Sequence, residues 1–113
     1  MKINRLVLPL AKAEYLLNYT TGPSVGGDKR KFWHEVMGYE SSEVLRKALL
    51  AQVTVDLLRA EGQNAFGERY DAILMLTDPS GMSWQIRTCW IVLFGEDVAR
   101  FVTAFPVRIR RPV

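Results

Sequence analysis

The chain has 113 residues, of which 49% are hydrophobic and 24% are charged, and its formal net charge is +3. This length fits one domain over residues 1–113 and excludes two, and the composition is globular rather than disordered. The mild positive charge suits a nucleic-acid partner without requiring one.

The single cysteine and the single histidine exclude several kinds of site. Cys89 has no second cysteine for an internal disulfide, and with His34 alone beside it a structural zinc site lacks ligands. The apolar run near the N-terminus is broken by Pro9 and Lys12, and no stretch approaches the roughly 18 apolar residues of a membrane span. We therefore expect a cytoplasmic protein, or a domain of a larger one, that uses no metal and no cofactor.

The first half of the chain has helical patterns. Residues 9–19 begin with a proline, which suits a first helical turn. Residues 29–37 follow a capping residue, Asp28, and precede Gly38, a natural helix stop. Residues 41–53 begin with serines suited to an N-cap and repeat apolar residues at four-residue spacing.

The second half has strand patterns. Residues 68–77 end at the turn sequence DPSG, residues 82–94 are rich in aromatic and β-branched residues, and residues 99–109 form a third apolar run. Residues 55–67 fit either a further strand and turn or the end of a helix. Because short turns favour antiparallel neighbours, the fold class is expected to be α+β, with N-terminal helices packed on a C-terminal antiparallel β-meander of three to four strands.

Alternation along these strands predicts which side chains share a face. On residues 82–94 the even positions from Trp84 to Phe94 form one face, and the odd positions point away from it. On residues 99–109, Arg100, Val102, Ala104 and Arg108 are expected to alternate with Phe101, Thr103 and Phe105.

Arginines within these apolar strands are unusual, because an unpaired buried charge is costly. A face that carries Arg87 with Arg100 or Arg108 would bind a phosphate backbone well. The alternative is that these arginines pair with acidic residues of the chain, namely Glu68, Asp71 or Asp97. The residues alone leave both interpretations open.

The segment GPSVGGDK, residues 22–29, has the glycine spacing of a phosphate-binding P-loop but departs from it at the decisive positions. Asp28 stands where the lysine belongs, Lys29 comes one place late, and no Ser or Thr follows for a magnesium ion. A carboxylate at a helix start also takes the N–H groups that an anion would use. We expect a turn and a helix cap.

Two further side chains have a functional and a structural interpretation. His34 lies four residues from Arg30 and three from Lys31, so the three share one helix face, as a general acid or base of RNA cleavage would require. A solvated face with a Lys31–Glu35 pair explains the pattern too, and for the histidine alone it is favoured. Thr103 is either a core hydroxyl or a site hydroxyl.

Four segments resemble a known family: LAKAEYLLN, DKRKFW followed by MGY, FGERY, and IRTCWIV followed by ARFVTAFP. They are similar to an uncharacterised family of small bacterial domains that occur alone, at the C-termini of polymorphic toxins and in phage-associated proteins. The matching residues are Lys29, Phe32, Trp33, Gly67, Tyr70, Arg87, Thr88, Trp90, Arg100, Thr103 and Pro106. The chain departs from the family pattern at Ser24, Val25, Arg30 and Ala99.

The order of helices before an antiparallel sheet, with a closing VTAFP strand, also resembles the barnase/EndoU/colicin/RelE-like superfamily of RNase toxins. This resemblance implies an active site on the sheet face that helices leave uncovered, built from varied combinations of Lys, Arg, Tyr, Thr and His. It is an analogy from fold to function.

We therefore expect a metal-independent RNase-like toxin domain that cleaves RNA through the 2′-hydroxyl, with RNA and an immunity or antitoxin protein as partners. The expected catalytic residues are Arg87 and Arg100 for phosphate binding, Lys29 and His34 for proton transfer or substrate contact, and Thr103 for positioning. The expected nucleic-acid-binding residues are Arg30, Lys31, Arg108, Arg110 and Arg111. The alternative is a non-catalytic phage- or toxin-associated module that binds protein or nucleic acid through the same basic face.

Overall fold

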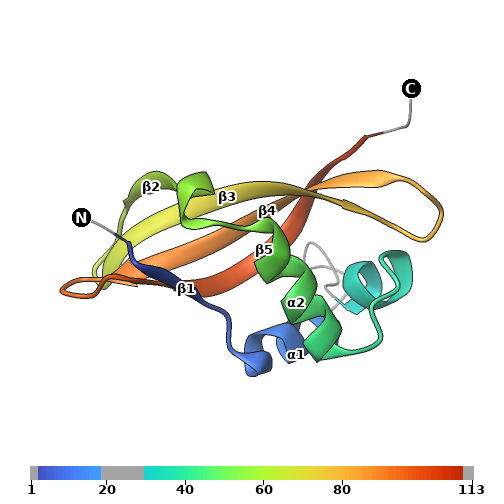
Figure 1. Ribbon diagram of the computed structural model, residues 1–113, viewed down its shortest axis with the longest axis horizontal. Coiled ribbons are helices and arrows are strands. Elements are labelled where there is room, and N and C mark those ends of the chain that lie inside the picture. Colours follow the sequence, from blue (N-terminus) through green and yellow to red (C-terminus); the bar gives the residue numbers. More distant parts are fainter. Residues whose placement is uncertain (1–2, 19–29, 111–113) are drawn as a thin grey trace.

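The computed structural model describes residues 3–18 and 30–110 of the chain, and side chains as far as residue 107. Its fold is α+β, as predicted, and its five strands form one sheet in the order β1-β5-β4-β3-β2 (Figure 1). In chain order the elements are β1 (Arg5–Val7), α1 (Leu10–Asn18), the π-helix η1 (Lys31–Val36), α2 (Ser42–Gln52), the 3-10 helix η2 (Val55–Leu57), β2 (Arg59–Gln63), β3 (Gly67–Thr77), β4 (Ser83–Leu93) and β5 (Val98–Arg110).

The helix boundaries follow local capping chemistry. Helix α1 begins directly after Pro9, and the hydroxyl of Ser41 caps α2 by accepting a hydrogen bond from the Val44 N–H. Gly38 stops η1 with a φ of 78°, a conformation that costs glycine little. The predicted cap at Asp28 lies outside the described residues. Within the described ranges, no helix has the length and apolar character needed to cross a membrane.

The sheet is larger than the sequence patterns predicted. Strands β2 to β5 form a four-stranded antiparallel meander, and β1 adds a fifth strand parallel to the start of β5, with Val7 opposite Arg100. We predicted no strand at β1, because three residues at a sheet edge carry no alternation to recognise. The ambiguous stretch at 55–67 forms η2, β2 and the turn into β3.

Helices α1, η1 and α2 cover one face of this sheet and create the core there (Figure 1). Leu16, Trp33 and Leu45, one from each of α1, η1 and α2, are fully buried and belong to one cluster with Ile86 and Trp90 of β4. As predicted, the even positions of β4 face this core. Burial of such apolar side chains stabilises the fold by about 1.5–3 kcal/mol for each residue.

A β-bulge corrects the predicted alternation of residues 99–109. On β5, Val102 is inserted between Phe101, which pairs with Trp90, and Thr103, which pairs with Cys89. The extra residue shifts the pleat, so side chains beyond it change face. The core side of β5 therefore carries Phe101 and Ala104, and the opposite side carries Arg100, Thr103 and Phe105.

Asp78 organises the turn between β3 and β4 at the predicted DPSG sequence. One of its carboxylate oxygens accepts hydrogen bonds from the Ser80 hydroxyl at 2.6 Å, the Ser80 N–H at 2.9 Å and the Met82 N–H at 3.1 Å. The other accepts a hydrogen bond from the Trp84 indole at 2.9 Å. These bonds, led by that of Ser80, lower the pKa of Asp78 from its ordinary 3.8 to about 2.

This turn predicts how stability depends on pH in acid. Because the folded-state pKa is lowered, the contribution of Asp78 is present above about pH 4 and is lost as the pH falls toward 2. We expect Asp78→Asn to lower the melting temperature at neutral pH and to flatten its dependence on pH in that window. Thermal unfolding at a series of pH values measures both, with Asp56→Asn on exposed η2 as the control. Parallel curves for Asp78→Asn and the parent protein would contradict the assignment.

Candidate functional site

The sheet face opposite the helices carries charged and apolar side chains together. We call it the open face, and define it by Arg59 of β2, Asp71, Ile73 and Met75 of β3, Gln85, Arg87 and Cys89 of β4, and Arg100, Thr103 and Phe105 of β5. Register places them in rows across the strands: Arg59–Asp71–Cys89–Thr103 is one row, and Ile73–Arg87–Phe105 is the next.

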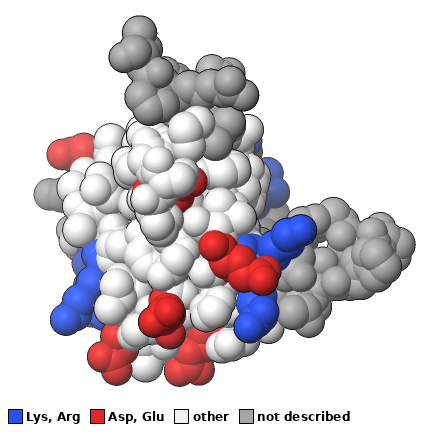
Figure 2. Space-filling view, turned by 90° about the vertical axis from the view of Figure 1, so that its right-hand side faces the viewer, with Lys and Arg blue, Asp and Glu red and all other residues white. Residues whose placement is uncertain are grey.

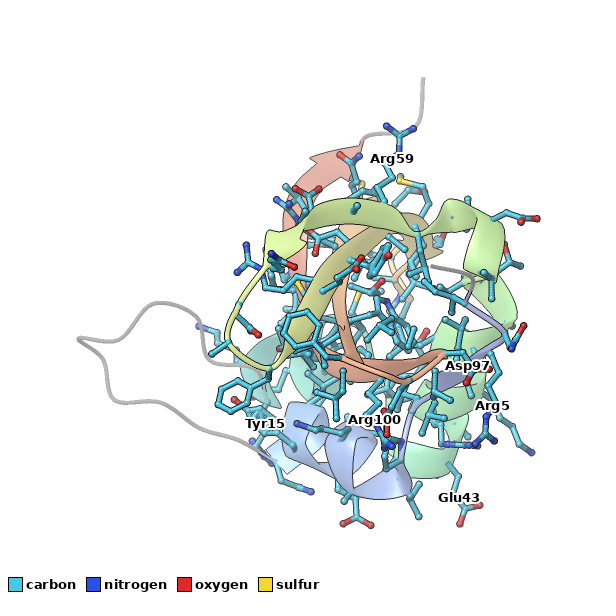
Figure 3. The ribbon with its side chains drawn as sticks, turned by 90° about the vertical axis from the view of Figure 1, so that its left-hand side faces the viewer. Arg5, Tyr15, Glu43, Arg59, Asp97 and Arg100 are labelled. Carbon is cyan, nitrogen blue, oxygen red and sulfur yellow. The ribbon has the colours of Figure 1, made fainter. Side chains whose placement is uncertain are left out.

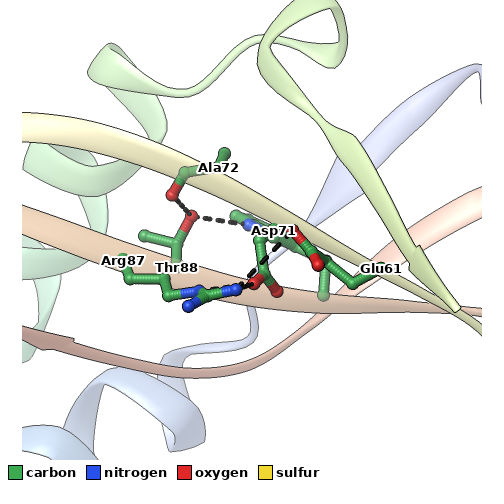
Figure 4. A network of polar contacts seen from close by, with 6 residues as sticks. Glu61, Asp71, Ala72, Arg87 and Thr88 are labelled. Atoms are coloured by element: carbon green, nitrogen blue, oxygen red, sulfur yellow. Dashed lines mark hydrogen bonds and ion pairs between the residues drawn. The ribbon is translucent and has the colours of Figure 1, made fainter.

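Arg87 is held at the centre of the open face by two carboxylates (Figure 4). Its guanidinium forms a hydrogen-bonded ion pair with Asp71, and one of its nitrogens lies 3.6 Å from a carboxylate oxygen of Glu61. The hydrogen bond to Asp71 raises the pKa of Arg87 above its usual value. The side chain of Asp71 is 13% exposed, against 38% for Arg87 and 40% for Glu61. The guanidinium is thus oriented by Asp71 and remains accessible from the surface.

A shallow pocket of about 290 Å³ opens over this ion pair. Arg59, Glu61, Asp71 and Arg87 supply its polar lining, and its apolar lining comes from η2 and β3. Two arginines and two carboxylates in one surface hollow are able to bind an anionic group and to accept a proton beside it.

Thr103 adds a hydroxyl to the same neighbourhood. It pairs with Cys89, one row from Arg87, so the Cβ atoms of Thr103 and Arg87 are diagonal neighbours at about 7–8 Å. The Thr103 hydroxyl oxygen is buried and has no hydrogen-bond partner within the part of the chain that the structure describes. A buried hydroxyl without a partner is costly, which favours the interpretation of Thr103 as a site residue.

Arg100 shares the open face but does not lie beside Arg87. It pairs with Ile91, four residues along β4 from Arg87, a separation of roughly 13 Å at about 3.3 Å per residue. Its guanidinium donates hydrogen bonds to Glu96 at 3.1 and 3.3 Å, which raise the pKa of Arg100. Figure 3 shows Arg59 near the top of the molecule and Arg100 in its lower half in that view.

His34 lies on the other side of the sheet. Its segment, η1, packs on the helix-covered face, where the Phe32 ring meets the Trp84 ring edge-on at 5.0 Å. Exposed Arg30 and Lys31 belong to the same segment. The structure therefore separates these three residues from Arg87 and Thr103.

The remaining predicted site residues cannot be placed beside these. Lys29 and Arg111 lie outside the described residues, as do the side chains of Arg108 and Arg110. Figure 2 shows the end of the molecule near η1 and the β3–β4 turn, where acidic and basic side chains of the described surface stand side by side.

Sequence reasoning identified Arg87 and Thr103 but missed Glu61, Arg59 and Phe105 as their neighbours. It named Asp71 only as one of three acids that could pair with an arginine, and that pairing is confirmed for Arg87. No sequence pattern pointed to Glu61 as a site residue, because residues 55–67 fitted either a strand and turn or the end of a helix. Thr103 and Phe105 were both assigned to the face of Phe101, which is wrong, because nothing in the sequence marks the bulge at Val102.

No group of three or more His, Cys, Asp and Glu side chains able to hold a metal ion occurs among residues 3–18 and 30–107. The open face offers guanidinium, carboxylate and hydroxyl groups for candidate chemistry.

Residues 2–108 match the sequence profile of a family described as a domain of unknown function, DUF6883. The chain belongs to this family. No curated protein and no solved structure matches the chain. The match covers nearly the whole chain, so the helices and the sheet both lie within the matched residues.

The R-T-x-W segment of this DUF6883 domain divides its side chains between the two faces of the sheet. Arg87 points to the open face, whereas Thr88 is fully buried on the core side. The Thr88 hydroxyl donates a hydrogen bond to the Ala72 carbonyl and accepts one from the Trp90 indole, both at 2.8 Å (Figure 4). Thr88 thus ties β3 to β4 directly behind Arg87.

This bridge predicts a purely structural effect for Thr88→Val. The substitution keeps the volume but leaves the buried Ala72 carbonyl and Trp90 indole without this partner, so we expect a loss of about 1–3 kcal/mol in the free energy of unfolding. Urea unfolding measures the loss, and Thr77→Val, at an exposed position of β3, is the matched control. Equal stabilities of the two variants would contradict the bridging role.

Proposed function

We propose that this DUF6883 domain is a metal-independent ribonuclease that cleaves RNA through the 2′-hydroxyl and acts as a toxin in the cytoplasm. The observation that supports it is the grouping of an accessible, oriented Arg87, an exposed carboxylate and a buried, unpartnered Thr103 hydroxyl on the sheet face that α1, η1 and α2 leave uncovered. A toxin of this kind would need an immunity or antitoxin protein as its second partner.

The residues of the open face supply most of what the reaction needs. Glu61, which is exposed and only loosely paired, accepts the proton of the 2′-hydroxyl. The 2′-oxygen then attacks phosphorus, the bond to the 5′-oxygen breaks, and the leaving oxygen takes a proton from water at the open surface. The products are a 2′,3′-cyclic phosphate and a 5′-hydroxyl end.

Arg87 acts on the phosphate in this scheme. The guanidinium, oriented by Asp71, stabilises the negative charge that grows on the phosphate oxygens. Thr103 is a positioning residue, because its hydroxyl is buried. Asp71 is a positioning residue, because its contact is with Arg87. Arg59 lines the same pocket and adds positive charge for the RNA backbone.

The proposal predicts the effect of removing the guanidinium. Arg87→Ala should lower kcat by about 100- to 1,000-fold, since it removes a charge that acts mainly in the transition state. Glu61→Gln should lower kcat by at least about 100-fold and leave RNA binding in place. The measurement is cleavage of a mixed RNA panel in EDTA, with cyclic-phosphate ends as the diagnostic product.

Two controls accompany this test. Lys47→Ala removes an exposed positive charge from α2, on the helix-covered side, and should cleave as the parent protein does. Circular dichroism verifies that each variant is folded. Intact RNA after incubation with folded parent protein, together with normal growth of bacteria that express it, would contradict the proposal.

A non-catalytic binding module is the second candidate, and a specific observation favours it. Arg87 and Arg100 are each paired with carboxylates, so the open face carries less net positive charge than its arginines suggest. For a binder of nucleic acid, Arg87→Ala should weaken affinity and reduce its salt dependence, whereas for an enzyme it should reduce turnover with little loss of binding.

A further inference from the structure

Phe105 lies opposite Arg87 on the neighbouring strand of the open face. The two residues are a cross-strand pair, so their Cβ atoms are about 4.5–5.5 Å apart. Phe105 is 37% exposed, although a phenylalanine of this size usually gains most from burial in the core. Pro106 follows it on β5 and restricts the backbone there.

We infer that Phe105 is a stacking platform for a nucleobase of single-stranded RNA, whose adjoining phosphate is held at Arg87. This inference rests on the proposed function and specifies its substrate. An exposed aromatic side chain next to a cation matches the base and the phosphate of one nucleotide.

The surroundings of Phe105 support a base more than other apolar ligands. Ile73 of β3 pairs with Arg87 on the side away from Phe105, and Met75 lies two residues further along β3. Both side chains are exposed. Exposed apolar side chains therefore lie on both strands that flank Arg87. Bases of double-stranded RNA are buried in their own stack, so this surface selects single strands.

Phe94 provides a matched control within the same chain. It is 52% exposed, but it lies in the β4–β5 turn, next to Glu96 and Asp97 and seven residues along the chain from Arg87. An acidic setting of this kind repels a phosphate. Replacing its ring therefore tests for effects of lost aromatic surface that have nothing to do with RNA.

The experiment is a double-mutant cycle between the protein and the substrate. The substrate is a short single-stranded oligonucleotide with one ribonucleotide as its only cleavable position, and its abasic partner lacks the base at that nucleotide. We expect Phe105→Leu to raise KM roughly tenfold for the substrate with the base, to leave kcat almost unchanged, and to have little effect on the abasic substrate. Phe94→Leu should leave KM unchanged for both substrates.

The outcomes separate this inference from the proposed function. Cleavage with the same KM for Phe105→Leu and the parent protein, or an equal rise in KM for both substrates, overturns the stacking role and leaves the ribonuclease in place. If the parent protein cleaves nothing, the same cycle is measured as Kd with all-deoxy oligonucleotides. A base-dependent loss of affinity for Phe105→Leu then supports stacking without catalysis, and absence of binding overturns both.

Discussion

The ion pair between Arg87 and Asp71 is the interaction on which the open face depends. It lies on neighbouring rows of the two central strands, directly in front of the Thr88 hydroxyl that bridges the Ala72 carbonyl and the Trp90 indole. Since both sets of bonds join β3 to β4, the register of these strands is fixed from both faces. A shift of the register by one residue would bury the charge of Arg87 and expose the apolar ring of Trp90, and both changes would destabilise the fold.

This constraint also determines which function the face can perform. A guanidinium that is half-exposed and already oriented needs little reorganisation to bind a phosphate, and the carboxylates that orient it lie close enough to take a proton. The same carboxylates reduce its net charge, so affinity for RNA must also come from Arg59 and from apolar contact with the bases. Catalysis and binding therefore draw on different residues of one face, which is why variants can separate them.

Much of the fold follows from sequence patterns with a physical basis. The α+β class, the meander, the Asp78 turn and the inward face of β4 were all predicted, since strict alternation and turn residues report directly on burial. The bulge at Val102, the short β1 and the π-helical form of η1 were not. Each depends on contacts between distant segments: β1 is paired only through β5, and the bulge exists only relative to β4. Arg87 and Thr103 could be predicted for the site, whereas Glu61 could not, because its strand was itself ambiguous.

The most direct test of this account is an NMR titration of the isotope-labelled domain with a non-cleavable, all-2′-O-methyl single-stranded RNA. The account predicts chemical-shift changes centred on β3, β4 and β5 around Arg87 and Thr103, with the Arg87 side-chain resonance among the largest. Changes centred instead on η1 around His34, or no changes at saturating RNA, would contradict the claim that the open face is the functional site.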